Sequence, residues 1–294
     1  MAKISFEEFA KEVATAVQAA LAVKGKSVTV KVEPFSKNGV SVIGIVIKKD
    51  EENVAPCFNC TLEQYEKVTS GELSFGKYIN DLVSSYQNAE REASKYADVE
   101  RCLTPEFVFT NVFLSFVDRE RNKEMLETAV HCPFNDTNLE LVARIRVNEE
   151  ASFVVKKDML DVIGVSEADL LFSARLNTIT SATCIPMSNF FDMPEDVPMF
   201  AITNVDMCQG AASIINEYYL KELFETFGTF FILPSSVHEC IVIPNVADSN
   251  VPLDSLAEDL LALVCEVNQT EVLPQERLAD SVYIFDGDAV RQLK

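Results

Sequence analysis

The sequence lacks an uninterrupted run of about 18 apolar residues, the length that a membrane-spanning helix requires, so we expect no membrane span. It also lacks the pattern of a secretory signal peptide. Glu7, Glu8, Lys11 and Glu12 interrupt the apolar residues of the N-terminal stretch, whereas a signal peptide needs a continuous apolar core. These two absences predict a cytoplasmic protein.

Basic residues are scarce, with 25 Lys and Arg against 46 Asp and Glu and a net charge of −21. Such a surface repels phosphate backbones, which argues against direct nucleic-acid binding. Between Arg175 and Arg277 the only basic residue is Lys221. This acidic region is a candidate contact surface for a protein partner that the sequence does not identify. An alternative is an acidic inhibitor that mimics nucleic acid, although no regular double row of carboxylates is visible.

Motifs for nucleotides and metals are also missing. There is no GxGxxG, no GxxxxGK[ST] and no second CxxC beside Cys57 and Cys60. A structural zinc site needs four ligands, usually two such pairs, and the other six cysteines are isolated in the sequence. We therefore expect reduced thiols, a chance cysteine pair in or near a strand, no bound metal and no cofactor.

What is present suffices for a large core, because 48% of the 294 residues are hydrophobic. Ser5 and Glu8 form a capping-box pattern before the apolar periodicity of residues 6–23, which predicts an amphipathic first helix. Alternating apolar residues on both sides of Asn38-Gly39 predict a β-hairpin.

The rest of the chain mixes predicted helices and strands without a strict βαβ repeat. Further helices are predicted from Thr104-Pro105 onward and over 118–130, 165–177, 210–228 and 252–268. Strands are predicted over 139–147, 151–158, 198–204, 229–234, 239–244 and 281–286. This pattern indicates an α+β fold with helices packed on a mixed, mostly antiparallel sheet. We divide the chain into an N-terminal region of residues 1–130, with the first helix and the hairpin, and a larger C-terminal region of residues 131–294; the two can pack as one unit.

The stretch "FFILPSSVHECIVIP", residues 230–244, holds the first candidate site. Ser235, Ser236, His238 and Glu239 fall within five residues, and a hydrolase could use His238 with Ser235 or Ser236. On a strand, however, Glu239 would point away from His238, and no oxyanion signature precedes the serines. A turn with a histidine that contacts a ligand or partner is the alternative, because proline and serine favour turns.

Two further residues are candidates for binding. His131, the second histidine, could form a metal pair with His238, but no HxH or HExxH spacing supports one. Asn204 lies in a loop between a predicted strand and a helix start, where an anion could bind. The loop has a single glycine and no Lys-Ser/Thr pair, so a turn is the simpler interpretation.

Several stretches, in order, resemble the domain-of-unknown-function family numbered 5688, whose members occur in gut Firmicutes and their mobile elements. The matching stretches include "SFEEFAKEV", "DRERNKEMLETAVHCPFNDTNLELVARI", "LPSSVHE" and "VNQTEVLPQERLADSVYIFD". The resemblance covers nearly the whole chain and implies a bacterial or phage-related cytosolic protein. It supplies no reaction, cofactor or catalytic residue. His131 and His238 both fall in matching stretches, but Cys132 stands where the family pattern has a basic residue.

These observations favour a cytosolic binding or interaction protein without an assigned reaction. Its expected contact surface is the turn from Pro234 to Glu239 together with the acidic C-terminal region. A hydrolase that uses His238 and an acidic nucleic-acid mimic are the alternatives.

Overall fold

The computed structural model describes residues 4–49, 55–96, 99–148, 151–191, 198–234, 236–245 and 252–294. The chain divides into two compact units, Met1–Val99 and Glu100–Lys294. The division predicted after residue 130 falls inside the second unit. The reason is that strand β4 (Val112–Asp118) pairs along its whole length with β6 (Leu139–Arg146), which lies beyond that point.

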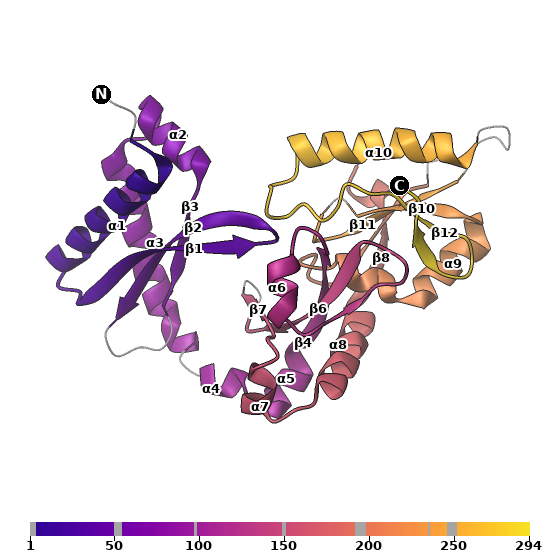
Figure 1. Cartoon of the computed structure of the whole chain (residues 1–294), viewed down its shortest axis with the longest axis horizontal. Helices are drawn as coiled ribbons and strands as arrows, with labels where there is room; N and C mark the ends of the chain where they lie inside the picture. Colours follow the sequence, from indigo (N-terminus) through magenta and orange to yellow (C-terminus); the bar gives the residue numbers. More distant parts are fainter. Residues whose placement is uncertain are drawn as a thin grey trace. The chain divides into compact units, whose positions relative to one another are not determined.

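The first unit is a three-stranded antiparallel sheet with helices (Figure 1). Its elements are α1 Phe6–Val23, β1 Val28–Lys37, β2 Val40–Lys49, β3 Cys57–Cys60, α2 Leu62–Ser70 and α3 Phe75–Tyr96. The strands lie in the order β1-β2-β3. The core of this unit joins the buried face of α1 to the sheet and α3 through aromatic residues such as Phe9 and Tyr78, whose rings stack.

Local sequence signals account for the start of this unit. The side chain of Ser5 accepts a hydrogen bond from the backbone of Glu8, and the Glu8 side chain accepts one from the backbone N–H of Ser5, so the predicted capping box begins α1. Asn38 and Gly39 have φ angles of 50° and 72°. Two successive positive φ angles match the type I′ turn that joins two-residue hairpins. Both predictions from the sequence are confirmed.

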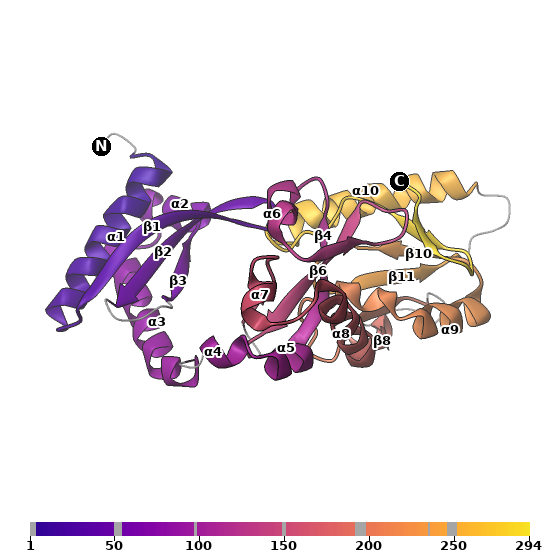
Figure 2. The same ribbon diagram turned by 60° about the horizontal axis from the view of Figure 1, so that its bottom comes forward.

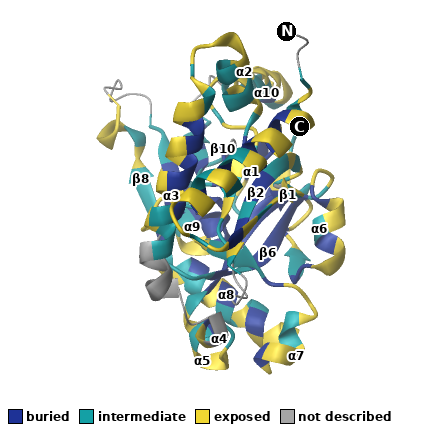
Figure 3. Ribbon diagram, turned by 90° about the vertical axis from the view of Figure 1, so that its left-hand side faces the viewer, coloured by how far each residue is buried: buried dark blue, intermediate teal, exposed yellow. Residues whose placement is uncertain are grey.

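The second unit contains two sheets (Figures 1 and 2). In the four-stranded sheet the order is β4-β6-β5, and β7 also pairs with β6. This sheet and the helices next to it in the chain are α4 Val99–Cys102, α5 Pro105–Asn111, β4 Val112–Asp118, α6 Lys123–Thr128, β5 His131–Pro133, β6 Leu139–Arg146, β7 Ser152–Val154, α7 Met159–Ile163 and α8 Glu167–Ser181. Helix α4 spans the boundary between the two units. Figure 3 shows β6 buried along most of its length.

The six-stranded sheet follows in the chain, in the order β13-β12-β10-β11-β9-β8. Its elements are β8 Ala182–Pro186, η1 Met187–Asn189, β9 Phe200–Asn204, η2 Ala211–Ile215, α9 Glu217–Phe227, β10 Phe230–Leu233, β11 Cys240–Pro244, α10 Leu253–Thr270, β12 Tyr283–Phe285 and β13 Val290–Gln292. Alternate residues of β10 pack in two different hydrophobic clusters. Phe230 and Ile232 belong to the main core of the unit, whereas Phe231 and Leu233 pack in the cluster that includes residues of α10. The sheet is therefore covered on both faces.

The predicted α+β class is confirmed, and every pairing between named strands in the described residues is antiparallel. Some predicted elements are different. Within the helix predicted over 118–130, only α6, Lys123–Thr128, is helical, because Asp118 ends β4. Residues 210–228 form the short helix η2 and then α9 rather than one long helix. Asn216 separates them, because its side chain accepts a hydrogen bond from the backbone of Tyr218 and caps the start of α9.

Candidate functional site

A pocket of about 330 Å³ lies in the second unit, where two helices run directly into strands. α5 ends at Asn111 and β4 follows at once, and α8 ends at Ser181 where β8 begins. β9, its following loop and Arg146 at the end of β6 complete the wall. Most lining side chains are polar: Thr110, Asn111, Arg146, Asn177, Thr178, Thr180, Ser181, Asn204, Gln209 and Ser213.

Hydrogen bonds from α8 hold the two helix–strand junctions together. The Asn177 side chain donates to the carbonyls of Phe109 (2.9 Å) and Val112 (2.8 Å), where α5 becomes β4. The hydroxyl of Thr178 accepts from the backbone N–H of Leu114 at 2.8 Å. Among the described strands β4 lies at the edge of its sheet, and this contact satisfies a backbone donor that none of them takes. The pocket wall is thus built from fixed backbone.

Asn204, a residue that the sequence indicates for binding, is in the buried part of the pocket. It is the last residue of β9, and it lies opposite Ala182 at the α8–β8 junction. Its side chain donates to the carbonyl of Cys208 (2.8 Å) and accepts from the Cys208 N–H (3.2 Å). On either side of Cys208, Met207 and Gln209 have φ angles of 50° and 55°, a region that few non-glycine residues adopt. Asn204 therefore fixes the loop that closes the pocket.

His238 stabilises the same loop through its ring and its backbone carbonyl group. Its Nδ1 accepts a hydrogen bond from the backbone N–H of Gln209 at 3.3 Å, and its Nε2 lies 3.8 Å from a carboxylate oxygen of Glu276. Because Nδ1 accepts, the neutral ring carries its proton on Nε2. The carbonyl of His238 also accepts from the Thr203 hydroxyl (2.7 Å) and the Gly210 N–H (3.0 Å). His238 thus reaches the pocket through Gln209.

The other candidates in the 235–239 turn have different surroundings. Ser235 lies outside the described residues. Ser236 is 6% exposed, and its hydroxyl accepts from the backbone N–H of His238 at 2.9 Å. Among the described residues, the ring nitrogens of His238 contact Gln209 and Glu276 rather than the Ser236 hydroxyl. The contacts therefore do not assemble the Ser236–His238 pair that the hydrolase alternative requires.

Glu239 is half-buried beside this turn. Burial raises the pKa of its carboxyl group; nearby His238 and a hydrogen bond with Ser236 oppose the rise, and Glu276 adds to it. Pro234 and Val237 are buried. The described residues of the turn consequently expose little apolar surface, and their accessible groups are the half-buried side chains of His238 and Glu239.

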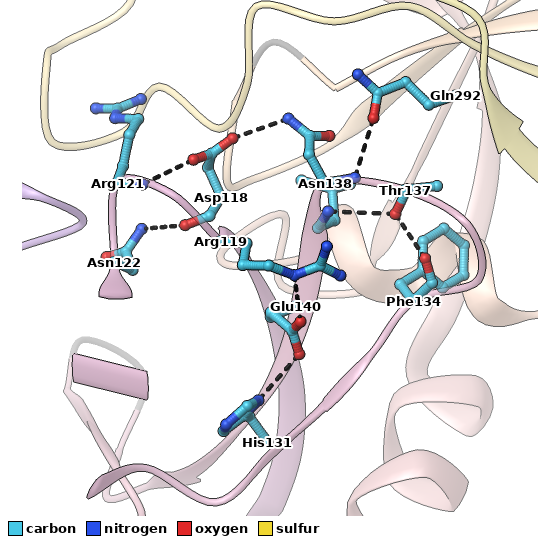
Figure 4. A network of polar contacts seen from close by, with 11 residues as sticks. Asp118, Arg119, Arg121, Asn122, His131, Phe134, Thr137, Asn138, Glu140 and Gln292 are labelled. Atoms are coloured by element: carbon cyan, nitrogen blue, oxygen red, sulfur yellow. Dashed lines mark hydrogen bonds and ion pairs between the residues drawn. The ribbon is translucent and has the colours of Figure 1, made fainter. Parts of the chain in front are cut away.

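His131 lies elsewhere in the second unit, on β5, in a network of polar contacts (Figure 4). Its Nδ1 is 2.9 Å from one oxygen of Glu140, and Arg119 Nε donates to the other oxygen at 2.7 Å. Only 6% of the Glu140 side chain is exposed. These two partners compensate the burial of its charge. Glu140 holds the proton of His131 on Nδ1, so the ring is oriented, but His131 does not line the pocket around Asn204.

Figure 4 also shows how the ends of β4 and β6 are joined to the C-terminal strand. Asp118 accepts from the Arg121 N–H (2.9 Å) and from the Asn138 side chain (2.9 Å). The Asn138 N–H donates to the side chain of Gln292 at 3.1 Å, and the Tyr283 hydroxyl donates to Asn138. Burial raises the pKa of Tyr283 far above its ordinary value, so this hydroxyl remains a donor. The network links the two sheets of the second unit.

Of the described residues that line the pocket, the sequence predicted Asn204 for binding; Arg146, Gln209 and Ser213 are among those that it did not predict. Arg146 ends β6, and its guanidinium carbon lies 4.9 Å from the centre of the Phe113 ring. Ser213 is 1% exposed, and its hydroxyl has no hydrogen-bond partner among the described residues. The segment "GAASII" gives no sign of this, because a serine in an apolar run resembles any small core residue. A buried hydroxyl without a partner is uncommon and calls for an explanation.

Within the described residues, no group of three or more His, Cys, Asp and Glu side chains could hold a metal ion. Cys57 and Cys60 lie on β3, so the predicted location in or near a strand is confirmed. Residues three apart on a strand point to opposite faces; Cys57 is exposed and Cys60 is buried. None of the described helices is long and apolar enough to cross a membrane.

A model of a family of unknown function, DUF5688, matches residues 6–287. The search of curated proteins and the search of solved structures each gave no match.

Proposed function

Because the chain belongs to this family of unknown function, we propose its function from the site itself: it is a binding protein that holds a small polar molecule in the Asn204 pocket. The observation that carries the proposal is the buried Ser213 hydroxyl without a partner among the described residues, in a pocket lined mostly by polar side chains. Natural proteins leave few buried polar groups unpaired, and a bound molecule would supply the missing partner.

The size and construction of the pocket support the proposal. A volume of about 330 Å³ is at the lower end of the range for ligand pockets, which fits a small metabolite. The buried residues Leu114, Thr178 and Asn204 form its inner wall, and the exposed Thr110 and Thr180 lie at its rim. Since the wall is held by hydrogen bonds between elements, binding would require little reordering.

The test is a titration of the ¹⁵N-labelled full chain, followed through the side-chain amide signals of Asn177, Asn204 and Gln209. The probes are lactate, lactamide, benzoate, benzamide, gluconate and gluconamide. We expect at least one probe to shift these three signals together and in a saturable way. If no probe moves them at 20-fold excess over the protein, on the order of millimolar concentrations, the proposal is wrong.

A blocking variant assigns the binding to the pocket. In Thr110→Trp, an indole at the rim would obstruct the entrance, and we expect affinity to fall at least tenfold. Thr128→Trp is the matched control, because Thr128 is an exposed threonine at the end of α6 that does not line the pocket. Equal affinity in both variants would contradict the assignment.

The proposal also includes where the protein acts and which surface contacts a partner. We propose that the protein acts in the bacterial cytoplasm, in keeping with the family resemblance, and is encoded on chromosomes or mobile elements. The acidic stretch between Arg175 and Arg277 remains the proposed surface for a protein partner. The acidic-mimic alternative also remains a prediction, and a pull-down with the full chain would identify the partner on which both depend.

A further inference from the structure

The charge of the pocket differs from that of the chain around it. Acidic residues outnumber basic ones by 46 to 25 in the sequence, yet none of the described residues that line the pocket is acidic. Arg146 is the lining residue that carries a charge at neutral pH. Because the interaction between charges strengthens away from bulk water, an anionic group would be favoured at Arg146.

Arg146 is held in position from two sides. Its guanidinium lies over the Phe113 ring, with 4.9 Å from the guanidinium carbon to the ring centre. One of its amino groups, Nη1, pairs with Asp206, in the loop after β9. The Asp206 side chain is 46% exposed, and ion pairs with solvated partners are weak. The guanidinium has five N–H donors in a planar fork, so donors remain for a second carboxylate.

Two further polar side chains of the pocket have no hydrogen-bond partner among the described residues. The Ser213 hydroxyl has no hydrogen-bond partner in the described part of the chain. The side-chain amide of Gln209 likewise makes no hydrogen bond to any described residue, although its backbone N–H donates to His238. Both residues line the same pocket as Arg146. They can satisfy a hydroxyl or carbonyl group at the other end of a small molecule.

Resting on the proposed function, we propose that the pocket selects a small carboxylic acid. Its carboxylate binds the guanidinium of Arg146, and its second polar group hydrogen-bonds to Ser213 and Gln209. The donors that Arg146 keeps beyond its contact with Asp206 suit a group with one negative charge. A phosphate with two charges would call for a second cation, and the described lining provides none.

The test compares each carboxylate with the carboxamide of the same shape: lactate with lactamide, benzoate with benzamide, and gluconate with gluconamide. Dissociation constants come from the same amide signals of Asn177, Asn204 and Gln209 in the full chain. We expect the carboxylate of at least one pair to bind ten times or more tightly than its amide, and more tightly than inorganic phosphate. Charge-assisted hydrogen bonds are about twice as strong as neutral ones.

Two variants at the ion pair separate the roles of Arg146 and Asp206. We expect Arg146→Gln to weaken carboxylate binding at least tenfold and to leave carboxamide binding within about twofold. Asp206→Asn should instead tighten carboxylate binding several-fold, because it removes the anion that competes for the guanidinium. This gain cannot arise from damage to the fold. Arg175→Gln is the control, since Arg175 is an exposed arginine on α8 that does not line the pocket.

The outcomes separate the two proposals. If carboxamides bind as tightly as carboxylates and Arg146→Gln changes neither, the pocket binds ligands but the carboxylate inference is wrong. Tighter binding of phosphate than of every carboxylate would also overturn it. If no probe moves the three amide signals, both proposals fail together.

Discussion

At the scale of single residues, Gly210 shows how closely the loop at the pocket is packed. A Cβ atom at this position would lie 2.4 Å from the Thr203 hydroxyl, 2.6 Å from the backbone nitrogen of Asn204 and 2.8 Å from the backbone carbonyl oxygen of His238. Two of these three atoms belong to the backbone, so they cannot move aside as a flexible side chain would. We expect Gly210→Ala to lower the free energy of unfolding by about 2 kcal/mol, in the range for overpacked sites.

Urea unfolding followed by circular dichroism measures this loss. The control is Gly76→Ala on α3, where the added methyl group would meet no atom within 4 Å. Alanine is also the better helix former, so the control should be neutral or slightly stabilising. An unchanged urea midpoint for Gly210→Ala would show that the loop is looser than the contacts around Gly210 indicate.

Cys184 provides a pH-dependent prediction at the same scale. Burial, with a smaller effect of Glu222, raises the pKa of this thiol from about 9 to about 11. Because only the thiolate reacts with iodoacetamide, the rate in the folded protein should rise about tenfold for each pH unit from pH 8 to pH 10. Mass spectrometry of the Cys184 peptide gives the rate. In urea the rise should level off near pH 9, and a folded protein that levels off there would contradict the prediction.

At the scale of elements, the hairpin of the first unit depends on its two turn residues. Gly39 has a φ angle of 72°, which a residue with a Cβ atom adopts only at a cost of about 1 kcal/mol. We expect Gly39→Ala to destabilise the pairing of β1 with β2 by this amount. Hydrogen exchange of the backbone amides in β2 should then become about fivefold faster.

The control for the hairpin is Ser36→Ala, since Ser36 is exposed and lies within β1 opposite Ser41. It removes a hydroxyl group without changing the turn, so exchange in β2 should stay within about twofold of the wild type. Equal acceleration in both variants would mean that the strands rather than the turn set the stability of the hairpin.

The elements that the sequence predicted have their signals within a few neighbouring residues. Helix α1 follows from the Ser5–Glu8 capping box, and the hairpin follows from Asn38-Gly39. β4 was not predicted, because all seven of its residues are buried and an apolar run lacks the alternation of a half-buried strand. No sequence signal marks the start of β4 either. α5 passes into β4 at Val112 with no glycine or proline between them.

At the scale of the whole molecule, the same reasoning explains which residues of the site were found. Asn204 and His238 stood out by residue type, and the structure connects both to one loop. The pocket itself joins residues 110–114, 146, 177–181 and 204–213, and only the folding of the second unit brings these segments together. The role of Arg146 depends on a contact with Phe113 across two strands and on a loop far along the chain. No local pattern encodes such contacts.

The boundary between the units gives the last prediction. Asp118 to Val112 of β4 pair in register with Leu139 to Ile145 of β6, and β4 is buried throughout. A fragment 100–294 keeps this pairing, so we expect it to fold alone and to give a dispersed ¹H–¹⁵N spectrum. A fragment 131–294 lacks β4 and α5 and leaves β6 without its longest partner, so the core of the unit would be open to water. We expect this shorter fragment to aggregate or to give a collapsed spectrum. A native-like spectrum from 131–294 would place the boundary at residue 130 after all, and would mean that the buried β4–β6 pairing is dispensable for the second unit.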